Sequence, residues 1–174
     1  METVNDEVAT ARTQVGRAMV ESLAERFAQL HSRSCKLIET TPPELLYRDL
    51  MGRNNNTCSQ SVGESVLRSA AVVEQTFGGI TANLWDDPFE WTLPEVLSTP
   101  GRIIEYLAEV EQTRKHAFGS FTGDADLLKK IATPSGQRKL IDLLLDSIVQ
   151  AAGYQGRAMG IRASLFNSPP AEYH

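Results

Sequence analysis

The stretch TPSGQRKLIDLLLDSIVQAAGYQGRAMGIRASLF, residues 133–166, has the apolar periodicity of a long helix. Thr133 followed by Pro134 predicts its start, because a capping hydroxyl precedes a proline whose missing N–H costs nothing at the first helical position. One predicted face carries Leu140, Leu144, Ala151 and Ala158, with Ile148 beside them. Other faces also carry apolar residues, namely Leu143, Leu145 and Val149. We therefore expect this helix to be enclosed on several sides.

A polar seam runs along the same predicted helix at steps of four and three residues, through Asp146, Gln150, Tyr154 and Arg157. Polar groups on a buried helix cost free energy unless they are paired. The seam is therefore the part of the sequence that favours a functional site. The alternative is a solvated helix edge with one buried tyrosine that makes a single hydrogen bond.

Composition limits the class of protein. The chain has 174 residues, 41% of them apolar, which predicts one globular domain. Its formal charge is −5 and it has no basic cluster, so we expect no nucleic-acid partner. No apolar run reaches the roughly 20 residues that span a bilayer, and the first residues lack the apolar core of a secretory signal. We expect a cytoplasmic protein with no membrane segment. Cys35 and Cys58 have no metal-ligand spacing, and we expect no disulfide between them in a reducing compartment.

Three further helices are predicted before residue 133. The first covers residues 15–39 and ends there because two prolines follow shortly after. Its apolar stripe consists of Met19, Leu23, Phe27, Leu30 and Leu37. The second begins with a capping box formed by Ser61 and Glu64, and a stop is predicted at the two glycines 78–79.

The third helix repeats the cap-plus-proline start at Thr99 and Pro100, and it is predicted to end by Gly119. Short helical turns are expected at residues 43–46 and 123–131, and a loop at residues 51–60. The connection between the second and third helices contains Trp85, Phe89 and Trp91. We expect these aromatic residues to pack over one end of the core or across a partner.

Four helices without strand-like alternation or a fixed-period repeat predict an all-α four-helix bundle over residues 15–166. Two connections of about 20 residues are long enough for crossover connections, so simple up-and-down order does not follow. Residues 1–14 are predicted to be a helical or disordered lead-in. Residues 167–174 are predicted to be a loose tail.

Several segments together resemble the DinB/YfiT-like superfamily of bacterial bundles, over roughly residues 15–166. These segments are the SVGE helix start at residues 61–64, TPGRIIEYLAEVEQTRK at 99–115, LIDLLLDSIVQAAGYQGRAMGI at 140–161 and RASL at 162–165. The resemblance implies a bundle of unusual helix order, usually a homodimer. It also implies a divalent metal held by three histidines, one on the second helix and two on the fourth. Relatives in that superfamily include thiol-dependent S-transferases and isomerases.

This chain departs from that pattern at all three metal-ligand positions. Arg68 stands seven residues after Ser61, and Gln150 and Tyr154 stand at the two positions on the fourth helix. Arginine cannot ligate a metal, and glutamine and tyrosine are poor ligands for zinc or nickel. The histidines of the chain are His31, His116 and His174, and none of them matches a ligand position. We therefore expect neither a metal nor another cofactor at this site.

The replacing residues favour a pocket for a small anionic ligand, in the cleft between the second and fourth helices. Arginine offers a rigid fork to a carboxylate or phosphate, while Gln150 and Tyr154 supply neutral orienting groups. The remaining candidate ligand-binding residues are Asp146, Ser147 and Arg157. The alternative for Arg68 is an ordinary surface arginine paired with Glu64 one turn away.

Three interpretations of function stay open. The first is a metal-free binding protein of DinB type that holds its ligand through Arg68. The second is an enzyme on the same fold, either a relative of the thiol transferases or an enzyme that uses Tyr154 as an acid. The third is a structural dimer with a vestigial site. A homodimer is expected, because the resemblance implies one and the 80–98 connection is rich in aromatic residues. Gly153, Gly156 and Gly160 add to this expectation by predicting close helix packing, either internal or at a dimer seam.

Overall fold

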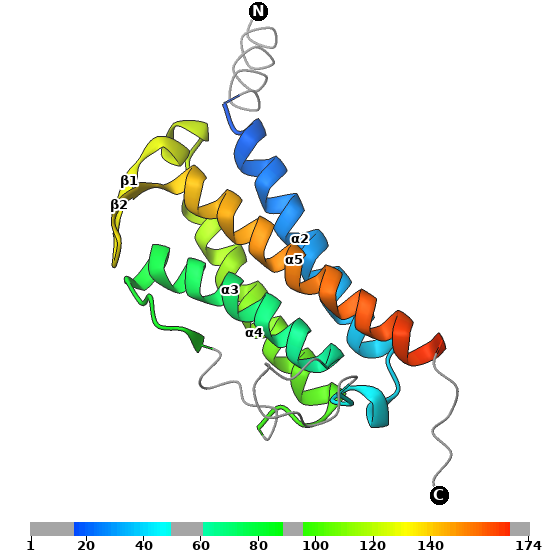
Figure 1. The fold of residues 1–174 in the computed structure, drawn as a ribbon. Helices are drawn as coiled ribbons and strands as arrows, with labels where there is room; N and C mark the ends of the chain where they lie inside the picture. The colour runs from blue at the N-terminus through cyan, green and yellow to red at the C-terminus, as the bar shows by residue number, and fades with distance from the viewer. Residues whose placement is uncertain (1–15, 50–60, 89–95, 168–174) are drawn as a thin grey trace, which may run out of the picture.

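Four helices and one two-stranded sheet make up the part of the chain that the computed structural model describes, residues 16–49, 61–88 and 96–167 (Figure 1). The helices are α2 (Ala18–Glu39), α3 (Val62–Ala82), α4 (Pro100–Ser120) and α5 (Leu140–Asn167). They pack around a shared apolar core, which confirms the predicted all-α four-helix arrangement. Several predictions fall outside the described residues: the lead-in at 1–14, the loop at 51–60, the aromatic residues Phe89 and Trp91, and the tail from residue 168 onward.

The helices form two parallel pairs, with α2 and α5 running one way and α3 and α4 the other (Figure 1). Ser69 of α3 donates a hydrogen bond to the Ala151 carbonyl of α5 (3.0 Å), and Arg114 of α4 donates one to the Ala24 carbonyl of α2 (3.2 Å). Because α3 and α4 are parallel, the end of α3 and the start of α4 lie at opposite ends of the bundle, which is the arrangement that a crossover connects (Figure 1). The connection from α2 to α3 joins neighbouring ends of antiparallel helices.

The helix start predicted at Thr133 and Pro134 is wrong, because both residues belong to a β-hairpin. Strand β1 (Lys130–Thr133) pairs with β2 (Gly136–Lys139) in antiparallel register. Gly136 has φ +115°, which favours glycine, and the Thr133 hydroxyl donates to the Gly136 carbonyl (2.7 Å). A Thr-Pro pair can begin a turn as well as a helix. Gly136, two residues after the proline, favours the turn. Helix α5 therefore begins only at Leu140.

The predicted starts of the second and third helices are confirmed by their caps, whereas α2 begins at Ala18 without a side-chain cap. The Ser61 hydroxyl accepts a hydrogen bond from the Glu64 N–H (3.1 Å), and the Thr99 hydroxyl accepts one from the Arg102 N–H (3.4 Å). The short turns appear as the 3-10 helices η1 (Pro43–Leu45) and η3 (Asp124–Leu128). The stop predicted at residues 78–79 is wrong, since α3 continues to Ala82 and ends at Asn83 in the left-handed conformation (φ 55°).

The centre of the core is a cluster of four phenylalanines from three helices and the residue after α4. Phe27 of α2 and Phe77 of α3 have ring centroids 5.0 Å apart, and Phe118 of α4 lies 5.5 Å from Phe77. Phe121 packs edge-on against Phe118 at 5.4 Å. Such tilted and edge-on contacts add to the stabilisation that comes from burial alone. The cluster therefore packs α2, α3 and α4 against one another.

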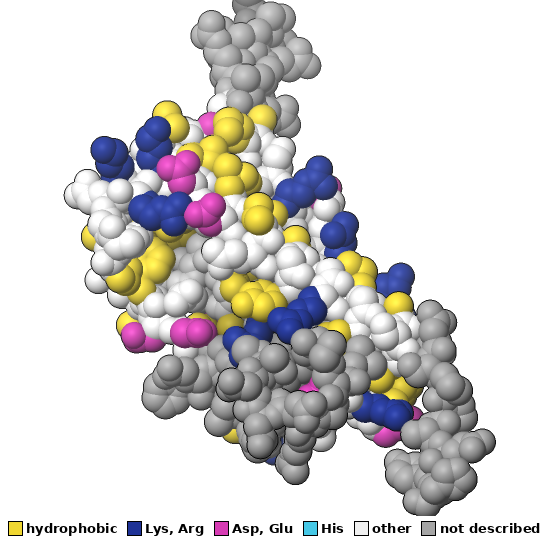
Figure 2. Space-filling model, viewed as in Figure 1, with side chains coloured by type: hydrophobic (Ala, Val, Ile, Leu, Met, Phe, Trp, Pro, Cys, Tyr) yellow, Lys and Arg dark blue, Asp and Glu magenta, His cyan; other side chains and the backbone are white. Residues whose placement is uncertain are grey.

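Two details of the predicted apolar faces are wrong. Val20 enters the core in place of its neighbour Met19, which is 50% exposed. On α5, Leu145 is 47% exposed and Val149 is 70% exposed, so this helix is not enclosed on those sides. Figure 2 shows exposed hydrophobic side chains on the face formed by α2 and α5. Periodicity identifies which residues share a face, but not which apolar face remains uncovered.

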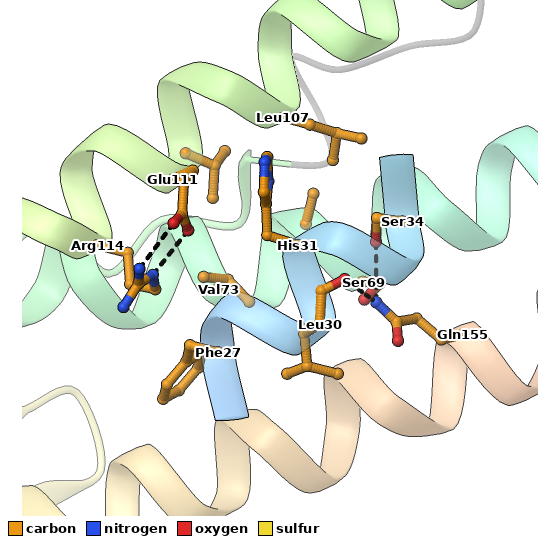
Figure 3. A pocket seen from close by; sticks show the side chains of 12 residues that line it. Phe27, Leu30, His31, Ser34, Ser69, Val73, Leu107, Glu111, Arg114 and Gln155 are labelled. Carbon is orange, nitrogen blue, oxygen red and sulfur yellow. Dashed lines mark hydrogen bonds and ion pairs between the residues drawn. The ribbon is translucent and has the colours of Figure 1, made fainter. Parts of the chain in front are cut away.

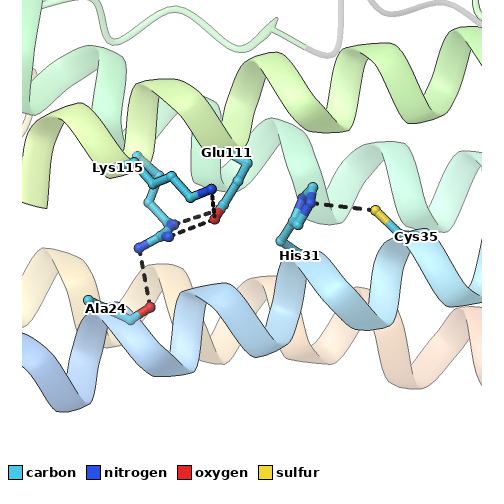
Figure 4. A network of polar contacts seen from close by, with 6 residues as sticks. Ala24, His31, Cys35, Glu111 and Lys115 are labelled. Atoms are coloured by element: carbon cyan, nitrogen blue, oxygen red, sulfur yellow. Dashed lines mark hydrogen bonds and ion pairs between the residues drawn. The ribbon is translucent and has the colours of Figure 1, made fainter.

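A buried ion pair links α4 to α2 (Figure 4). Arg114 donates from Nε and Nη2 to the two carboxylate oxygens of Glu111, both at 2.7 Å, and its Nη1 donates to the Ala24 carbonyl. The guanidinium also lies 5.5 Å from the Phe118 ring centroid. Burial by itself raises the pKa of Glu111, but the hydrogen bonds and charge of Arg114, with help from His31 and Lys115, outweigh it and lower that pKa.

We expect the Glu111 carboxylate to make stability pH-dependent in the acid range. Its folded-state pKa lies below its unfolded value, so its contribution is complete above the unfolded pKa and is lost as pH falls through the folded pKa. Glu111→Gln should therefore be much less stable than wild type near neutral pH, and the difference should shrink steadily below about pH 4.5. Urea unfolding at several pH values measures this. Glu105→Gln, on the exposed side of α4, is the control, and a difference that does not vary with pH contradicts the prediction.

Candidate functional site

Two adjoining hollows lie along the seam between α3 and α5. The Arg68 hollow has a volume of about 140 Å³ and is lined by residues of both helices and by Asp87. The hairpin hollow has a volume of about 280 Å³ and lies between α3, α5 and the turn of the β-hairpin. Val72, Gln75 and Gln150 line both hollows, so the two are parts of one groove.

The structure brings together most of the residues that the sequence nominates. Arg68 of α3 and Gln150 and Tyr154 of α5 line the Arg68 hollow. Asp146 and Ser147 line the hairpin hollow, next to Gln150. Arg157 lines neither hollow and is exposed on α5, so it is not placed with the other candidates.

Arg68 is both a groove residue and half of an ion pair. Its Nε and Nη2 atoms both donate to Oε1 of Glu64 at 3.3 Å. This is the pairing with Glu64, one helical turn away, that the sequence offers as the alternative interpretation of Arg68. Glu64 is buried, whereas the Arg68 side chain keeps 28% of its surface exposed. The second carboxylate oxygen of Glu64 has no hydrogen-bond partner in the described residues. Arg68 therefore reaches the hollow with its charge already partly balanced.

Three further residues line the groove that the sequence analysis does not predict as site residues: Gln75, Trp85 and Asp87. The Gln75 amide donates to the Trp85 carbonyl (2.8 Å), which fixes the start of the α3–α4 connection against α3. A Cβ at Gly79 would overlap the Trp85 ring, so the glycine allows the indole to lie directly on the helix. The feature of the sequence that could have pointed to Trp85 is Gly79, a glycine inside an apolar helix. A glycine at such a position can mark close packing as well as the end of a helix.

The hairpin hollow is bordered by an ion pair between the hairpin and α5. Nη2 of Arg138 on β2 lies 2.6 Å from Oδ2 of Asp146. The Ser147 hydroxyl is buried in the wall and has no hydrogen-bond partner among the described residues. A buried hydroxyl without a partner costs free energy, so Ser147 is a position that a ligand group can satisfy.

The interior of the bundle holds a second polar cluster, but it has almost no free space. Gln155 of α5 donates to the Leu30 carbonyl (2.6 Å) and to the Ser34 hydroxyl (2.9 Å) of α2 (Figure 3). The hollow beside it measures only about 20 Å³, which is room for about one water molecule. The cluster connects α5 to α2 by hydrogen bonds, and the hollow beside it is too small for an organic ligand.

Cys35 has a histidine nearby, since its sulfur lies 3.6 Å from Nε2 of His31. Burial raises the pKa of the Cys35 thiol, and the charges of Glu39 and Glu111 raise it further. The thiol form is therefore favoured, which does not suit a nucleophile. Cys58 lies outside the described residues. In the part of the chain that is described, no three His, Cys, Asp or Glu side chains are grouped so that they could hold a metal.

Comparison with known proteins found no match: no family model, no curated protein and no solved structure matches this chain. Among the described helices, none combines the length and apolar character required to cross a membrane.

Proposed function

We propose that this chain is a bundle of DinB type that binds a small molecule carrying an anionic group, in the groove between α3 and α5. The observation that carries the proposal is that Arg68, Gln150 and Tyr154, which are distant in sequence, line one hollow. The crossover between parallel helices agrees with the unusual helix order that the resemblance implies. The proposal includes a cytoplasmic homodimer without a bound metal.

The chemistry of these side chains suits binding. A guanidinium can donate two parallel hydrogen bonds to a carboxylate or a phosphate. Gln150 and Tyr154 stand one helical turn apart on α5, so an amide and a phenol face the same ligand. Together the two hollows reach the range of about 300–1,000 Å³ that small-molecule sites occupy.

A second candidate function is an enzyme on the same fold. The observation that favours it is that Tyr154 shares the hollow with Arg68, so a phenol that can donate a proton and a cationic group face the same ligand. The pairing of Arg68 with Glu64 favours instead the vestigial interpretation, in which the arginine serves only the fold.

We expect Arg68→Gln to abolish ligand-induced thermal stabilisation. A ligand at about a hundred times its Kd stabilises the folded state by about 2.7 kcal/mol, which raises the melting temperature measurably. Suitable probes, each with an anionic group, are phosphate, acetate, succinate and glycine, tested by thermal shift. Arg157→Gln is the matched control, because Arg157 lines neither hollow. A shift that persists in Arg68→Gln contradicts the proposal.

We also expect a homodimer that uses the uncovered side of α5. An added Cβ at Gly153, Gly156 or Gly160 would meet no atom outside its own helix within 4 Å in the described residues, so internal packing does not explain these glycines. Exposed Leu145 and Val149 lie on the same helix. Light scattering should give about twice the chain mass.

The dimer prediction has a matched pair of variants. Val149→Glu should yield the monomer by placing a charge in the contact, whereas Leu128→Glu, at an exposed leucine of η3, should not. A wild-type mass of 19.2 kDa at all concentrations contradicts the prediction.

A further inference from the structure

We propose that the hairpin hollow binds a sugar, an uncharged ring whose hydroxyl groups meet the polar side chains of the wall and whose C–H face lies against Trp85. The inference deepens the proposed function and rests on it only for the choice of the groove between α3 and α5. It uses no charge of the Arg68 hollow. The sugar can be a free monosaccharide or part of a phosphorylated one, and the experiment separates these two sources.

Three hydroxyl groups in the wall of the hollow are fixed as hydrogen-bond acceptors. Thr76 Oγ1 donates its proton to the Val72 carbonyl (2.8 Å), and Thr133 Oγ1 donates its proton to the Gly136 carbonyl (2.7 Å). Because Thr133 has no second proton, its 3.1 Å contact with Ser135 requires the Ser135 hydroxyl to be the donor. The lone pairs that remain on these oxygens can only accept, so the ligand must supply several donors.

The two charged residues that line the hollow, Arg138 and Asp146, balance each other. Nη2 of Arg138 lies 2.6 Å from Oδ2 of Asp146. A cationic ligand would be attracted by Asp146 and repelled by Arg138, and an anionic ligand the reverse, so neither sign of charge is favoured. The other carboxylate oxygen of Asp146 is one more acceptor. A neutral ligand with several hydroxyl groups therefore suits this wall better than a charged one.

Helix α5 adds two side chains with unused hydrogen-bonding capacity. Ser147 is only 3% exposed, and its hydroxyl has no partner among the described residues. A helical serine often donates to the carbonyl four residues earlier, as Thr76 does in α3, but Ser147 makes no such bond. Since Ser147 lines the hollow, a rotation about its Cα–Cβ bond presents the hydroxyl to a ligand. Gln150, which lines the same hollow, offers an amide that can both donate and accept.

Trp85 supplies an apolar surface in this largely polar wall. Its indole N–H already donates to the Asn83 side-chain oxygen (3.0 Å), and its backbone carbonyl accepts from Gln75 (2.8 Å). The ring lies directly on Gly79, where a Cβ would overlap it. The indole is therefore held in place and contributes its carbon ring to the wall. An aromatic ring packs well against the C–H groups on one face of a pyranose, whose hydroxyl groups point outward around the rim.

The size of the hollow suits one sugar ring. Its volume of about 280 Å³ lies at the lower end of the range of about 300–1,000 Å³ that small-molecule sites occupy. The Arg68 hollow continues the groove beyond Gln150, so a phosphate on the sugar can extend in that direction.

Titration calorimetry of the wild-type protein tests the ligand class. The probes are D-glucose, D-galactose and D-mannose, with cyclohexanol as a six-membered ring that has a single hydroxyl group and D-glucosamine as a cationic sugar. We expect the best hexose to bind at least about tenfold more tightly than cyclohexanol, and D-glucosamine to bind no more tightly than D-glucose. Cyclohexanol that matches the best hexose overturns the proposal, and so does a tenfold preference for D-glucosamine.

Thr76→Val tests the fixed acceptors, because valine has a similar shape but cannot accept a hydrogen bond. It should weaken the best hexose by about fivefold to tenfold. Thr81→Val is the matched control, since the Thr81 hydroxyl also donates to a carbonyl of α3, that of Phe77 (2.7 Å), but Thr81 does not line the hollow. Equal binding by the two variants contradicts the inference.

Ser147→Ala separates a binding role from a structural one. It should weaken the best hexose by a similar factor and leave the melting temperature unchanged or raised, because alanine removes a buried hydroxyl that has no partner. Unchanged hexose affinity in this variant overturns the role of Ser147. A second readout is Trp85 fluorescence in a Trp91→Phe background, which leaves Trp85 as the single tryptophan. Circular dichroism confirms that each variant is folded.

D-glucose 6-phosphate distinguishes this inference from the proposed function. If it binds more tightly than D-glucose, loses that advantage in Arg68→Gln, and Thr76→Val weakens both sugars, both proposals are supported and the source is a phosphorylated sugar. If it binds no more tightly than D-glucose and Arg68→Gln weakens neither, the anion site fails while the sugar site stands, with a free monosaccharide as its ligand. If phosphate stabilises the protein but no hexose binds at millimolar concentration, the sugar site is overturned while the anion site stands.

Discussion

Arg114→Met is expected to lower the free energy of unfolding by about 3–5 kcal/mol, because it leaves the carboxylate of Glu111 buried without its partner. The substitution also removes the hydrogen bond from Arg114 to the Ala24 carbonyl, which is a polar link between α4 and α2. Lys115, at 3.6 Å from Glu111, compensates only in part, since its own side chain is largely exposed. Urea unfolding at neutral pH measures the loss.

The double variant Glu111→Leu with Arg114→Met distinguishes two free energies: the net contribution of the ion pair to stability, and the cost of leaving one buried charge unpaired. Replacing a whole buried ion pair by apolar residues is often neutral or stabilising, so the double variant should recover most of the loss. Arg33→Met, on the exposed side of α2, should stay within about 0.5 kcal/mol of wild type. A single variant that is as stable as the double one contradicts this account.

Phe77→Ala is expected to cost about 3–5 kcal/mol, because it empties the middle of the phenylalanine cluster. Phe77 has no exposed surface, and its ring contacts those of Phe27 and Phe118 on two other helices. The rings around it cannot collapse into the space without moving their helices, so a cavity should remain. Thermal and urea unfolding would both report the loss.

Phe166→Ala is the matched control, because Phe166 is half exposed and stacks only with the Arg162 guanidinium among the contacts described for it. Its loss should be below about 1 kcal/mol. Phe77→Leu should fall between the two, since leucine refills part of the cavity. Equal losses for Phe77→Ala and Phe166→Ala would show that the cluster does not hold the bundle together.

The helices were predictable from the sequence because their signals are local. A cap and a proline at Thr99 and Pro100, and the prolines after α2, act within one or two turns and do not depend on distant residues. Thr133 and Pro134 were misread because the same pair suits a turn, and only Gly136 with its positive φ distinguishes the two. A short hairpin of this kind leaves almost no periodic signal.

Helical spacing alone does not indicate which helices face each other, so the grouping of Arg68, Gln150 and Tyr154 was an expectation that only the resemblance supplied. All three residues line one hollow. Asp87 could not be found, because nothing in a connection between helices indicates which helix it folds back on. Arg157 was nominated by its spacing alone, and a rotation of a fraction of a turn was enough to leave it outside the groove.

The two helices that line the groove, α3 and α5, can come into contact only after most of the chain has been synthesised. Ser69 and Ala151, whose hydrogen bond joins α3 to α5, are separated by 82 residues. During synthesis, α2, α3 and α4 emerge first, and the α3 side of the groove has no covering helix until α5 is complete. Non-local contacts of this kind slow folding in general, although the cost in stability rises only slowly with loop length. A nascent chain that stalls before residue 140 would therefore present α3's groove side to chaperones, and ligand binding would report completed folding.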